Sequence, residues 1–565
     1  MKDMVLLGDE AFALGTLHAG LSAAFGYPGT PSTEIMEYLI DNYERNRESC
    51  ENTPVAQWCS NEKTALEAAL GVSFSGRRAV VTMKHVGLNV AADPFMNASL
   101  CGIKGGLIIA VADDPSMHSS QGEQDSRFYA DFAMVPCFEP ATQQEAYEMA
   151  FEAFNVSEKY NVPVIMRFVT RLSHSRAVVN VDESKIRSQN KLEKADRKEW
   201  MLVPALARKN YEKMIAKQDE LIAYATSSSS NPLVLNKKRT DLAIITSGIG
   251  RNYFLENLPD YKAHCEKMFA GLGIPSTLHI GTLPLPVDSI KKLAEIAKTI
   301  LIIEEGQPFL EKQLSSVLPQ YTQVLGKFTG HLPRTGELNP DLVRKALGLE
   351  PNKTMLSETA GLKDACANLP GRPPQLCKGC PHIDSYISLN SAVASLVEKA
   401  GKDNVVVNAD IGCYALGGAA PLNAIETIVC MGASIGMARG ASQAGVKYTF
   451  GVIGDSTFLH SGITNLVDCV ATKTPVTVVL LDNTIVAMTG CQPTMLSSSQ
   501  FEPLIKGLGV EPEHIRILAT NPANREANAK VLIEEAEYRG VSVVIMVREC
   551  LEAFRIRNKK AKNDI

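Results

Sequence analysis

The chain has 565 residues, a net charge of −5 with the two signs interspersed, and the apolar (45%) and charged (21%) content of an ordinary globular protein. At roughly 150 residues per domain, this length predicts three or four domains, and the charge balance excludes a nucleic-acid-binding surface. The apolar runs are shorter than the ~20 residues of a membrane span, the N-terminus lacks a signal-peptide pattern, and the 13 cysteines are scattered, so a cytoplasmic protein with reduced thiols is expected.

Residues 1–175 are predicted to form a first α/β domain. Its apolar, strand-like runs, which alternate with amphipathic helical stretches, lie at 77–83, 105–112 and 162–169. This alternation is typical of a doubly wound parallel sheet. Residues 176–235 are richer in Lys, Glu and Ser and are interpreted as a connector, partly helical around Trp200–Ala225.

Two further α/β domains are expected after the connector. The second covers residues 236–350, a linker covers 351–376, and the third domain covers 377–565. Their strand-like runs are 242–248, 279–286, 299–306, 404–410, 448–455, 476–483 and 541–547. The predicted fold class is therefore α/β, with three domains built on parallel sheets.

The most informative motif is Gly454-Asp455-Ser456, which follows a strand and precedes Asn483 by a spacing of 26 residues. Asp455, Asn483 and the backbone carbonyl of Ile485 supply the oxygen ligands that Mg²⁺ prefers, with diphosphate and water completing the shell. Ser456, Thr457 and the N–H groups that open the next helix can meet phosphates. The pattern indicates thiamine diphosphate; the alternative is that Asp and Asn cap two ordinary turns.

Glu62 opens a helix-compatible stretch far upstream of this motif. In thiamine enzymes a carboxyl group bonds the aminopyrimidine ring, so that the thiazolium carbon can lose its proton. The small residues Ala65, Ala68 and Gly71 that follow Glu62 allow close packing against a neighbouring backbone. The alternative is a solvated glutamate favoured by the helix dipole.

Three polar segments of the first domain are candidates for substrate contact. Thr30 lies in the loop Gly26–Glu34, and its hydroxyl can contact a carboxylate or simply cap a helix. Met83–Pro94 offers Lys84, His85 and Asn89 after a strand, and Ser119–Arg127 is too rich in polar side chains to be expected in the core. Each of these segments either contacts substrate or caps and turns.

Cys377 and Cys380 form a C-x-x-C pair that opens the third domain, and Cys413 and Cys550 lie further along the chain. Four such thiols can hold zinc or an iron–sulfur cluster if the fold brings them together. Unligated thiols are the alternative, and that is the interpretation given to Cys430, Cys469 and Cys491. His382, beside the pair, is interpreted as a hydrogen-bonded polar group.

Taken in chain order, these motifs resemble the 2-oxoacid:ferredoxin oxidoreductases. The similarity runs from about residue 5 to residue 552 and is greatest to the large subunits of indolepyruvate ferredoxin oxidoreductase. It rests on the segments GYPGTPSTEI, NEKTALEAA, TMKHVGLNVAADP, SSQGEQDSR, CKGCPH, DIGCY, MGASIG, GDSTFLHSGI and LDNTIVAMTG.

The resemblance implies a pyrimidine-binding domain, a transketolase C-terminal-like domain and a diphosphate-binding domain, in that order. It implies oxidative decarboxylation of an arylpyruvate to an acyl-CoA, with coenzyme A as co-substrate and electrons leaving through iron–sulfur clusters. The residues it assigns to catalysis are Glu62, Thr30 and His85, and those it assigns to the cofactor are Glu62, Gly412, Cys413, Met431, Gly432, Gly454, Asp455, Ser456, Thr457, Asn483 and Met488. The implied metal ligands are Asp455, Asn483 and Ile485 for Mg²⁺, and Cys377, Cys380, Cys413 and Cys550 for one [4Fe-4S] cluster.

The chain departs from this family at its C-terminal end. The family's large subunit normally continues into a ferredoxin-like domain with two cysteine runs, whereas the residues after Cys550 contain no cysteine. A ferredoxin or ferredoxin-like subunit is therefore an expected partner, together with the family's small subunit. A homodimer or a dimer of heterodimers is expected, without nucleic acid or membrane. The alternative activity is a non-oxidative thiamine-dependent 2-oxoacid decarboxylase or carboligase.

Overall fold

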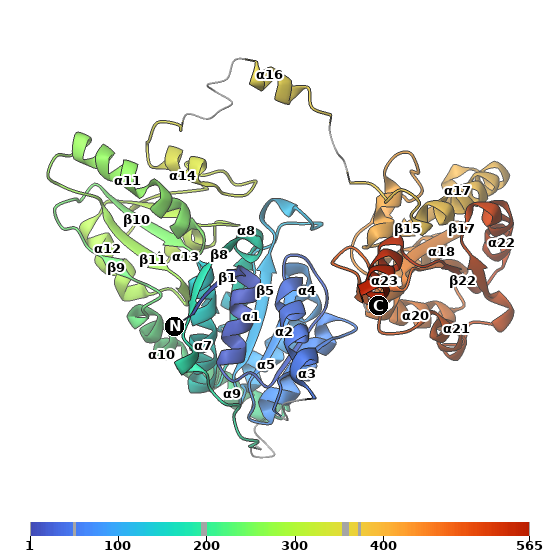
Figure 1. Ribbon diagram of the computed structural model, residues 1–565, viewed down its shortest axis with the longest axis horizontal. Helices are drawn as coiled ribbons and strands as arrows, with labels where there is room; N and C mark the ends of the chain where they lie inside the picture. Colours follow the sequence, from blue (N-terminus) through green and yellow to red (C-terminus); the bar gives the residue numbers. More distant parts are fainter. Residues whose placement is uncertain (1, 49–51, 194–199, 353–360, 371–373, 564–565) are drawn as a thin grey trace. The chain divides into compact units, whose positions relative to one another are not determined.

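The computed structural model describes residues 2–48, 52–193, 200–352, 361–370 and 374–563. The chain divides into two compact units, Met1–Ala367 (unit 1) and Asn368–Ile565 (unit 2) (Figure 1). Each unit is an α/β structure with its own hydrophobic cores. The predicted fold class is confirmed, whereas the domain boundaries given above remain predictions.

The larger sheet of unit 1 has seven strands, which run parallel except for β12 at one edge. In spatial order they are β3 (Val55–Trp58), β2 (Ala23–Gly26), β4 (Ala79–Lys84), β5 (Leu107–Asp113), β7 (Val164–Val169), β6 (Cys137–Phe138) and β12 (Thr282–Leu283). The central strands are continuous runs of buried residues, as expected of a parallel sheet covered on both faces.

Helices cover this sheet on both sides. They are α1 (Gly8–His18), α2 (Thr33–Asn46), α3 (Glu62–Phe74), α4 (His85–Val90), α5 (Ala92–Cys101), α6 (Arg127–Ala133), α7 (Gln143–Tyr160) and α8 (Thr170–His174). Helix α1 packs against both α2 and α7, and α3 packs against β2 and β4. An antiparallel ribbon of β1 (Lys2–Leu7) and β8 (Arg176–Val181) lies beside them.

The smaller sheet of unit 1 has five strands. In spatial order they are β14 (Gln323–Leu325), β13 (Thr299–Ile303), β10 (Leu242–Ser247), β11 (Ser276–Ile280) and β9 (Leu233–Val234), with only β9 antiparallel. The helices that follow β8 in unit 1 are α9 (Pro204–Ala216), α10 (Gln218–Ser227), α11 (Gly250–Met268), α12 (Val287–Ile296), α13 (Phe309–Leu314), α14 (Pro340–Ala346) and α16 (Leu362–Ala367). Of these, α11 and α12 pack against the smaller sheet, whereas α9 packs against α5. Because β12 directly follows β11 along the chain, it joins this sheet to the larger one.

Unit 2 contains a six-stranded sheet whose strands are all parallel. In spatial order they are β16 (Thr427–Ile428), β15 (Val405–Ala409), β17 (Tyr448–Gly454), β18 (Val476–Asp482), β22 (Val541–Val547) and β21 (Ile515–Ala519). Its helices are α17 (Pro381–Ala400), α18 (Ala433–Gln443), α19 (Asp455–Thr457), α20 (Ile463–Thr472), α21 (Ser498–Gly507), α22 (Arg525–Glu537) and α23 (Leu551–Asn563). A small hairpin pairs β19 (Ile485–Val486) with β20 (Gln492–Pro493).

The two large sheets share one strand order. Numbered by their sequence within each sheet, and leaving β12 aside, the strands lie in the order second, first, third, fourth, sixth, fifth in both. The chain therefore changes direction across the sheet between β2 and β4 in unit 1, and between β15 and β17 in unit 2. Ligands of open α/β sheets bind outside the carboxyl ends of the strands at such a switch point.

The long strands expected from the apolar runs are present except at 279–286, where β11 ends at Ile280 and only the two-residue β12 follows, and several short strands were missed. Strands β2 and β3 have only four residues each, too few for a clear hydrophobic pattern. The expected connector contains the two helices α9 and α10 and also the strands β8 and β9. Among the described residues, no helix is both long and apolar enough to cross a bilayer.

Candidate cofactor and substrate sites

The switch point of unit 1 gathers the polar residues that the sequence singled out. Thr30 follows β2, Glu62 follows β3, and Lys84 and His85 lie at the junction of β4 and α4. Because β3, β2 and β4 are parallel neighbours, their carboxyl ends meet at one edge of the sheet. The structure thus brings together the three residues of unit 1 to which the resemblance assigns catalysis.

Glu62 is buried and is not the cap of its helix. Asn61 caps α3 by accepting a hydrogen bond from the Thr64 N–H at 2.9 Å, so Glu62 is the first helical residue. Its side chain is only 5% exposed. Its carboxylate lies so close to α4 that a Cβ atom at Gly87 would be 2.6 Å from Glu62 Oε1. The alternative of a solvated helix-terminal glutamate is therefore wrong.

The Thr30 loop is closed by other hydroxyl groups. Ser32 Oγ donates to the Gly29 carbonyl at 2.7 Å, and the Gly29 N–H donates to Thr33 Oγ1 at 3.1 Å. The Thr30 carbonyl accepts from Ser119 Oγ at 3.3 Å, while its hydroxyl makes no hydrogen bond with any described residue. The turn therefore does not need the Thr30 hydroxyl, which leaves that group available to a ligand.

His85 is buried, and one of its two ring nitrogens has no hydrogen-bond partner among the described residues. It is 1% exposed, and its Nε2 lies 2.9 Å from the Gly122 carbonyl oxygen. Since a carbonyl only accepts, Nε2 donates in this contact. Nδ1 is the buried nitrogen without a partner. An unsatisfied buried polar atom at this sheet edge is the kind of group that a bound cofactor or substrate satisfies.

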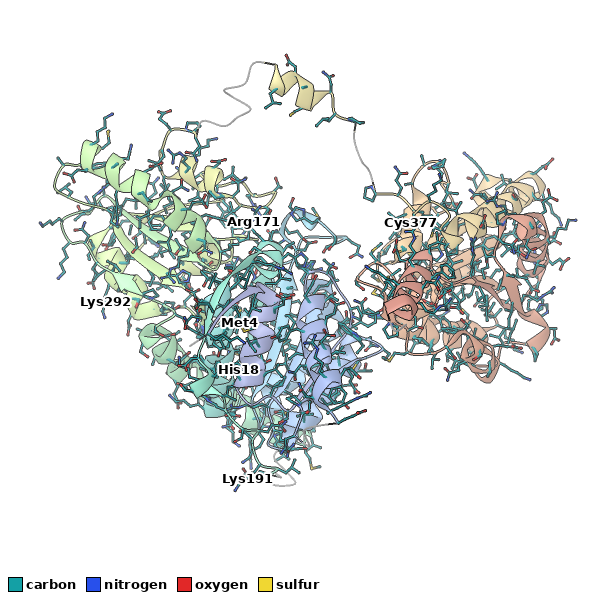
Figure 2. All side chains as sticks on the ribbon, viewed as in Figure 1. Met4, His18, Arg171, Lys191, Lys292 and Cys377 are labelled. Atoms are coloured by element: carbon teal, nitrogen blue, oxygen red, sulfur yellow. The ribbon has the colours of Figure 1, made fainter. Side chains whose placement is uncertain are left out.

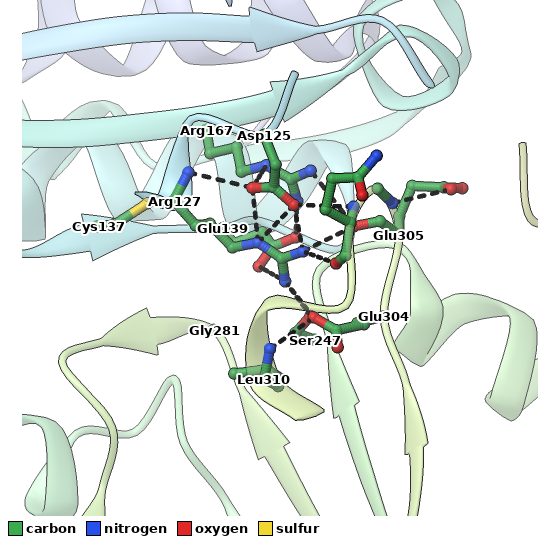
Figure 3. Close-up of polar contacts among 12 residues, drawn as sticks. Asp125, Arg127, Cys137, Glu139, Arg167, Ser247, Gly281, Glu304, Glu305 and Leu310 are labelled. Atoms are coloured by element: carbon green, nitrogen blue, oxygen red, sulfur yellow. Dashed lines mark hydrogen bonds and ion pairs between the residues drawn. The ribbon is translucent and has the colours of Figure 1, made fainter. Parts of the chain in front are cut away.

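The segment Ser119–Arg127 is partly core, which corrects the expectation of a surface loop. Arg127 is fully buried and, with Arg167, lies in a cluster of carboxylates between the two sheets of unit 1 (Figure 3). Arg127 pairs with Asp125 at 2.5 Å and with Glu304 at 2.9 Å. Its guanidinium also donates to the Glu305 carbonyl at 2.9 Å.

Arg167, on β7, extends the same cluster. It pairs with Asp113 at 2.6 Å and also with Glu139. Burial opposes the charged form of Asp125, but Arg127 and Arg167 together hold the pKa of this carboxyl at about 2. Burial raises the pKa of Glu304 to about 7 although Arg127 opposes it. The cluster holds the end of the loop Ser119–Arg127, and the first residue of this loop, Ser119, donates to the Thr30 carbonyl. The cluster therefore helps to fix the position of this loop beside the site.

In unit 2, Asp455 lies at the carboxyl end of β17, beside the switch point. Its Oδ1 accepts from the Ser456 N–H at 2.7 Å, and its Oδ2 accepts from the N–H groups of Asn483 (3.2 Å) and Thr484 (2.8 Å). Thr484 adopts a φ of 72°, rare for a β-branched residue. This conformation turns the loop so that consecutive N–H groups face one carboxylate.

Two carboxylates, those of Asp455 and Asp482, lie close together at this edge of the sheet, and a divalent cation would neutralise them. Burial and the neighbouring Asp482 carboxylate raise the pKa of Asp455 well above its usual range, and Asp482 Oδ2 is buried without a hydrogen-bond partner among the described residues. Asn483 Nδ2 donates to His382 Nε2 at 3.2 Å, and burial lowers the pKa of His382 to about 4. His382 is thus the hydrogen-bonded polar group expected, and two crowded carboxylates with one amide oxygen fit Mg²⁺.

Glycines flank this edge and keep it accessible. A Cβ atom at Gly412 or at Gly454 would lie 2.4 or 2.6 Å from the ring of Tyr414, whose hydroxyl donates to Asp410. Gly432 has a φ of 79°, and a Cβ there would be 2.6 Å from Ser461 Cβ.

The remaining predicted cofactor residues lie in the same unit. Thr457 Oγ1 donates to the Ile411 carbonyl at 3.1 Å, so its hydroxyl joins the ends of β17 and β15. Ser456 belongs to the short helix α19, Met431 is half-buried before Gly432, and Met488 is exposed. The sequence gave no role to Asp482 or Tyr414; Asp482 had a signal, because an acidic residue ends β18 directly before Asn483.

Cys377, Cys380, Cys413 and Cys550 belong to one region of unit 2 (Figure 2 labels Cys377). The Cys380 N–H donates to the Cys377 carbonyl at 2.9 Å, and a Cβ at Gly379 would be 3.4 Å from Leu551, the neighbour of Cys550. Burial raises the pKa of Cys413 to about 12, to which the other three thiols and Cys491 add.

These thiols are neighbours but not a finished ligand set. In the described part of the chain, no three His, Cys, Asp or Glu side chains form a group that could hold a metal ion. A cluster at this place requires the thiols to turn toward a common centre. The described cysteines are all free thiols. Of the three interpreted as unligated and buried, Cys469 is buried, Cys430 is exposed, and Cys491 lies beside the group.

The chain matches two models of thiamine-dependent proteins. Residues 14–225 match "Pyruvate flavodoxin/ferredoxin oxidoreductase, thiamine diP-bdg", and residues 410–537 match "Thiamine pyrophosphate enzyme, C-terminal TPP binding domain". The first match covers the sheet that holds Glu62, and the second covers the sheet that holds Asp455. Fold and site together define a thiamine-diphosphate enzyme that oxidises 2-oxoacids.

Relatives place the chain more closely within this class. It is 35% identical to indolepyruvate oxidoreductase subunit IorA of Archaeoglobus fulgidus (99% of this chain, 89% of the relative). It is also 35% identical to the IorA subunit of Methanothermobacter thermautotrophicus (97% and 87%). The chain belongs to the indolepyruvate oxidoreductase subunit IorA family and is an oxidoreductase subunit.

A solved structure supports the fold. The 2-oxoglutarate:ferredoxin oxidoreductase from Magnetococcus marinus, with 2-oxoglutarate, coenzyme A and succinyl-CoA bound, has a TM-score of 0.50 to this chain at 16% identity. The similarity covers 61% of this chain and 65% of that chain.

Proposed function

We propose that the chain catalyses the oxidative decarboxylation of a 2-oxoacid, an arylpyruvate such as indolepyruvate, to an acyl-CoA. The proposal adds Mg²⁺, coenzyme A and one [4Fe-4S] cluster to the thiamine diphosphate of the class. The substrate follows the printed name of the relatives. The observation that carries the proposal is the buried Glu62 carboxylate against Gly87, at the same sheet edge as Thr30 and His85.

Each proposed residue has a separate task. Bound thiamine diphosphate supplies a thiazolium carbon that becomes nucleophilic when its proton is lost. Glu62 shares a proton with the aminopyrimidine ring, and its burial excludes the water that would compete for that contact. His85 offers its unpartnered Nδ1 for a hydrogen bond, and Thr30 offers its hydroxyl to substrate.

In unit 2, Asp455, Asn483 and the Ile485 carbonyl hold Mg²⁺ in the proposal. The backbone and side chains of Gly454, Ser456 and Thr457 meet the diphosphate, and Gly412, Cys413, Met431, Gly432 and Met488 line the cofactor. Cys377, Cys380, Cys413 and Cys550 hold the cluster. Electrons then pass to ferredoxin or to a ferredoxin-like subunit, and the small subunit of the family is the other expected partner.

The test is product analysis on anaerobically purified protein together with its small subunit. With indolepyruvate, coenzyme A and a one-electron acceptor dye, we expect acyl-CoA, carbon dioxide and reduced dye, from protein that contains iron and absorbs visible light. An iron-free, colourless protein that releases aldehyde without reducing the dye contradicts the oxidative proposal and supports the non-oxidative alternative.

The role of Glu62 is tested by Glu62→Gln. This variant is expected to bind thiamine diphosphate normally and to lose at least ~100-fold in turnover, the scale of one acid–base group. Glu67→Gln is the matched control, since Glu67 lies on the same helix and pairs with Lys63 at the surface. Turnover of Glu62→Gln equal to that of Glu67→Gln would refute the assignment.

A further inference from the structure

Lys84 is a cation at the switch point of unit 1 to which the proposed function gives no task. It ends β4, directly before His85. Its ammonium donates to the Ser119 carbonyl at 3.1 Å, and its aliphatic chain lies beside the Thr30 loop, where a Cβ at Gly29 would be 3.3 Å from it. Lys84 therefore joins the loop that contains Thr30 to the loop that contains Ser119.

The charge of Lys84 is only partly compensated. Among the described residues, no carboxylate forms an ion pair with its ammonium. Burial lowers the pKa of Lys84 to about 8, against the opposing effect of Asp114 and Glu62. An ammonium has three N–H donors, and a single backbone carbonyl accepts from this one.

Asp114 is the carboxylate with the largest effect on the pKa of Lys84, but its oxygens already accept hydrogen bonds from other groups. Its Oδ2 accepts from the Ser119 N–H at 2.8 Å and from Ser120 Oγ at 2.7 Å, and its Oδ1 accepts from Thr170 Oγ1 at 2.8 Å. These neutral donors hold Asp114 in place. The ammonium thus keeps unused donors in a half-buried position at the edge where Glu62, Thr30 and His85 meet.

We propose that the Lys84 ammonium binds the carboxylate of the 2-oxoacid substrate and selects acids over neutral ketones. This inference rests on the proposed function, because it names the substrate-binding cation of the same site. A charge-assisted hydrogen bond from a partly desolvated ammonium is about twice as strong as a neutral one. The Thr30 hydroxyl is a neutral donor and provides no such charge.

The test measures binding and not turnover. An aryllactate carries the substrate's carboxylate but no reactive ketone, and its amide has nearly the same shape without the charge. Calorimetric titration of both into the complete protein, with and without thiamine diphosphate and Mg²⁺, gives their dissociation constants. We expect wild type to bind the lactate more tightly than the amide. Lys84→Met is expected to bind the lactate at least ~10-fold more weakly than wild type does, with its affinity for the amide unchanged. Lys84→Arg should keep most of the wild-type preference for the lactate.

Lys327→Met is the matched control for stability. Lys327 is also a desolvated lysine whose ammonium donates to a backbone carbonyl, that of Gly306, but it lies outside the site. We expect this variant to unfold more easily yet to keep the preference of wild type for the lactate.

Three outcomes overturn the proposal. The first is that wild type binds the lactate and the amide equally well. The second is that Lys84→Met keeps the wild-type preference for the lactate. The third is that Lys84→Met weakens binding of the lactate and the amide equally, which would show that Lys84 only holds the Ser119 loop. Absence of thiamine diphosphate binding in wild type would overturn the proposed function instead, while the lactate-to-amide ratio would still decide the role of Lys84.

Discussion

Gly87 shows how one missing side chain defines the position of a catalytic candidate. It lies inside α4 with ordinary helical backbone, so its conformation does not require glycine. Glycine is required because the Glu62 carboxylate occupies the space that a Cβ atom would need. A Cβ atom there would meet Oε1, Cγ and Cδ of Glu62 within 2.9 Å. Since these atoms are the far end of a flexible side chain, a larger residue moves Glu62 and leaves the fold intact.

Gly87→Ala is therefore expected to lower turnover by about 100-fold, the effect of a misplacement of about 1 Å at a reacting group. Its melting temperature should stay near that of wild type. Gly71→Ala in α3 is the control, because a Cβ there meets nothing within 4 Å. Steady-state turnover and thermal unfolding of both variants check this, and a Gly87→Ala enzyme as active as Gly71→Ala would show that the position of Glu62 does not matter.

At the scale of elements, the Arg127–Arg167 cluster joins the two sheets of unit 1. Asp125 comes from the loop before α6, Arg127 is the first residue of α6, Arg167 lies on β7, and Glu304 and Glu305 follow β13 (Figure 3). Removing one guanidinium leaves carboxylates buried without their counter-charge, which costs far more than the intact pair contributes.

Arg127→Met should therefore lower the free energy of unfolding of unit 1 by about 3–5 kcal/mol. Arg171→Met, which breaks a half-exposed pair with Glu337, should cost less than about 1 kcal/mol. Urea unfolding of the full chain, followed by circular dichroism, measures both. Equal costs for the two variants would mean that the buried cluster does not hold the sheets together.

His279 on β11 gives the smaller sheet a dependence on pH. Its Nδ1 lies 3.0 Å from Thr246 Oγ1, its Nε2 is buried without a partner among the described residues, and burial, with a contribution from Arg251, lowers its pKa to about 3. In the unfolded chain the pKa is about 6.5. Protons therefore favour the unfolded state, and stability is lost as the pH falls below about 6.5.

Between pH 7.5 and pH 5, wild type should lose about 2 kcal/mol more stability than His279→Gln. The comparison removes the effect of other titrating groups, because they are common to both proteins. Urea unfolding of the two proteins at both pH values measures the difference. Parallel losses would show that His279 is protonated in the folded chain.

The sequence predicted the long buried strands and, through them, the sheet edges of both candidate sites. Asp455 and Asn483 could be located because each follows a strand of seven residues. The burial of Arg127 could not be predicted, since its counter-charge Glu304 is distant in sequence and only the docking of two sheets brings it near. The need for glycine at position 87 could not be predicted either, because it comes from the side chain of Glu62, which lies on another helix.

At the scale of the whole molecule, the two units have separate cores. The clusters around Ile108 and Val81 contain only residues of unit 1, and those around Val407 and Val478 only residues of unit 2, in the described part of the chain. The two units should therefore unfold in two separate transitions, so a two-state model does not describe the unfolding of the whole chain.

Differential scanning calorimetry of the full chain is expected to resolve these two transitions. Thiamine diphosphate with Mg²⁺ should raise the transition of unit 2, by about 2.7 kcal/mol of stability at a ligand concentration 100 times its dissociation constant. Chelation with EDTA, or the variant Asp455→Ala, should abolish that increase. A rise that survives both treatments would contradict the magnesium assignment.

Because the two large sheets share one strand order, the third strand of each ends beside the switch point of its own sheet. Lys84 is the last residue of that strand in unit 1, and Asp455 directly follows it in unit 2. The same topology thus presents a cation at one switch point and an anion at the other, so the strand order alone does not determine which charge of ligand an edge attracts.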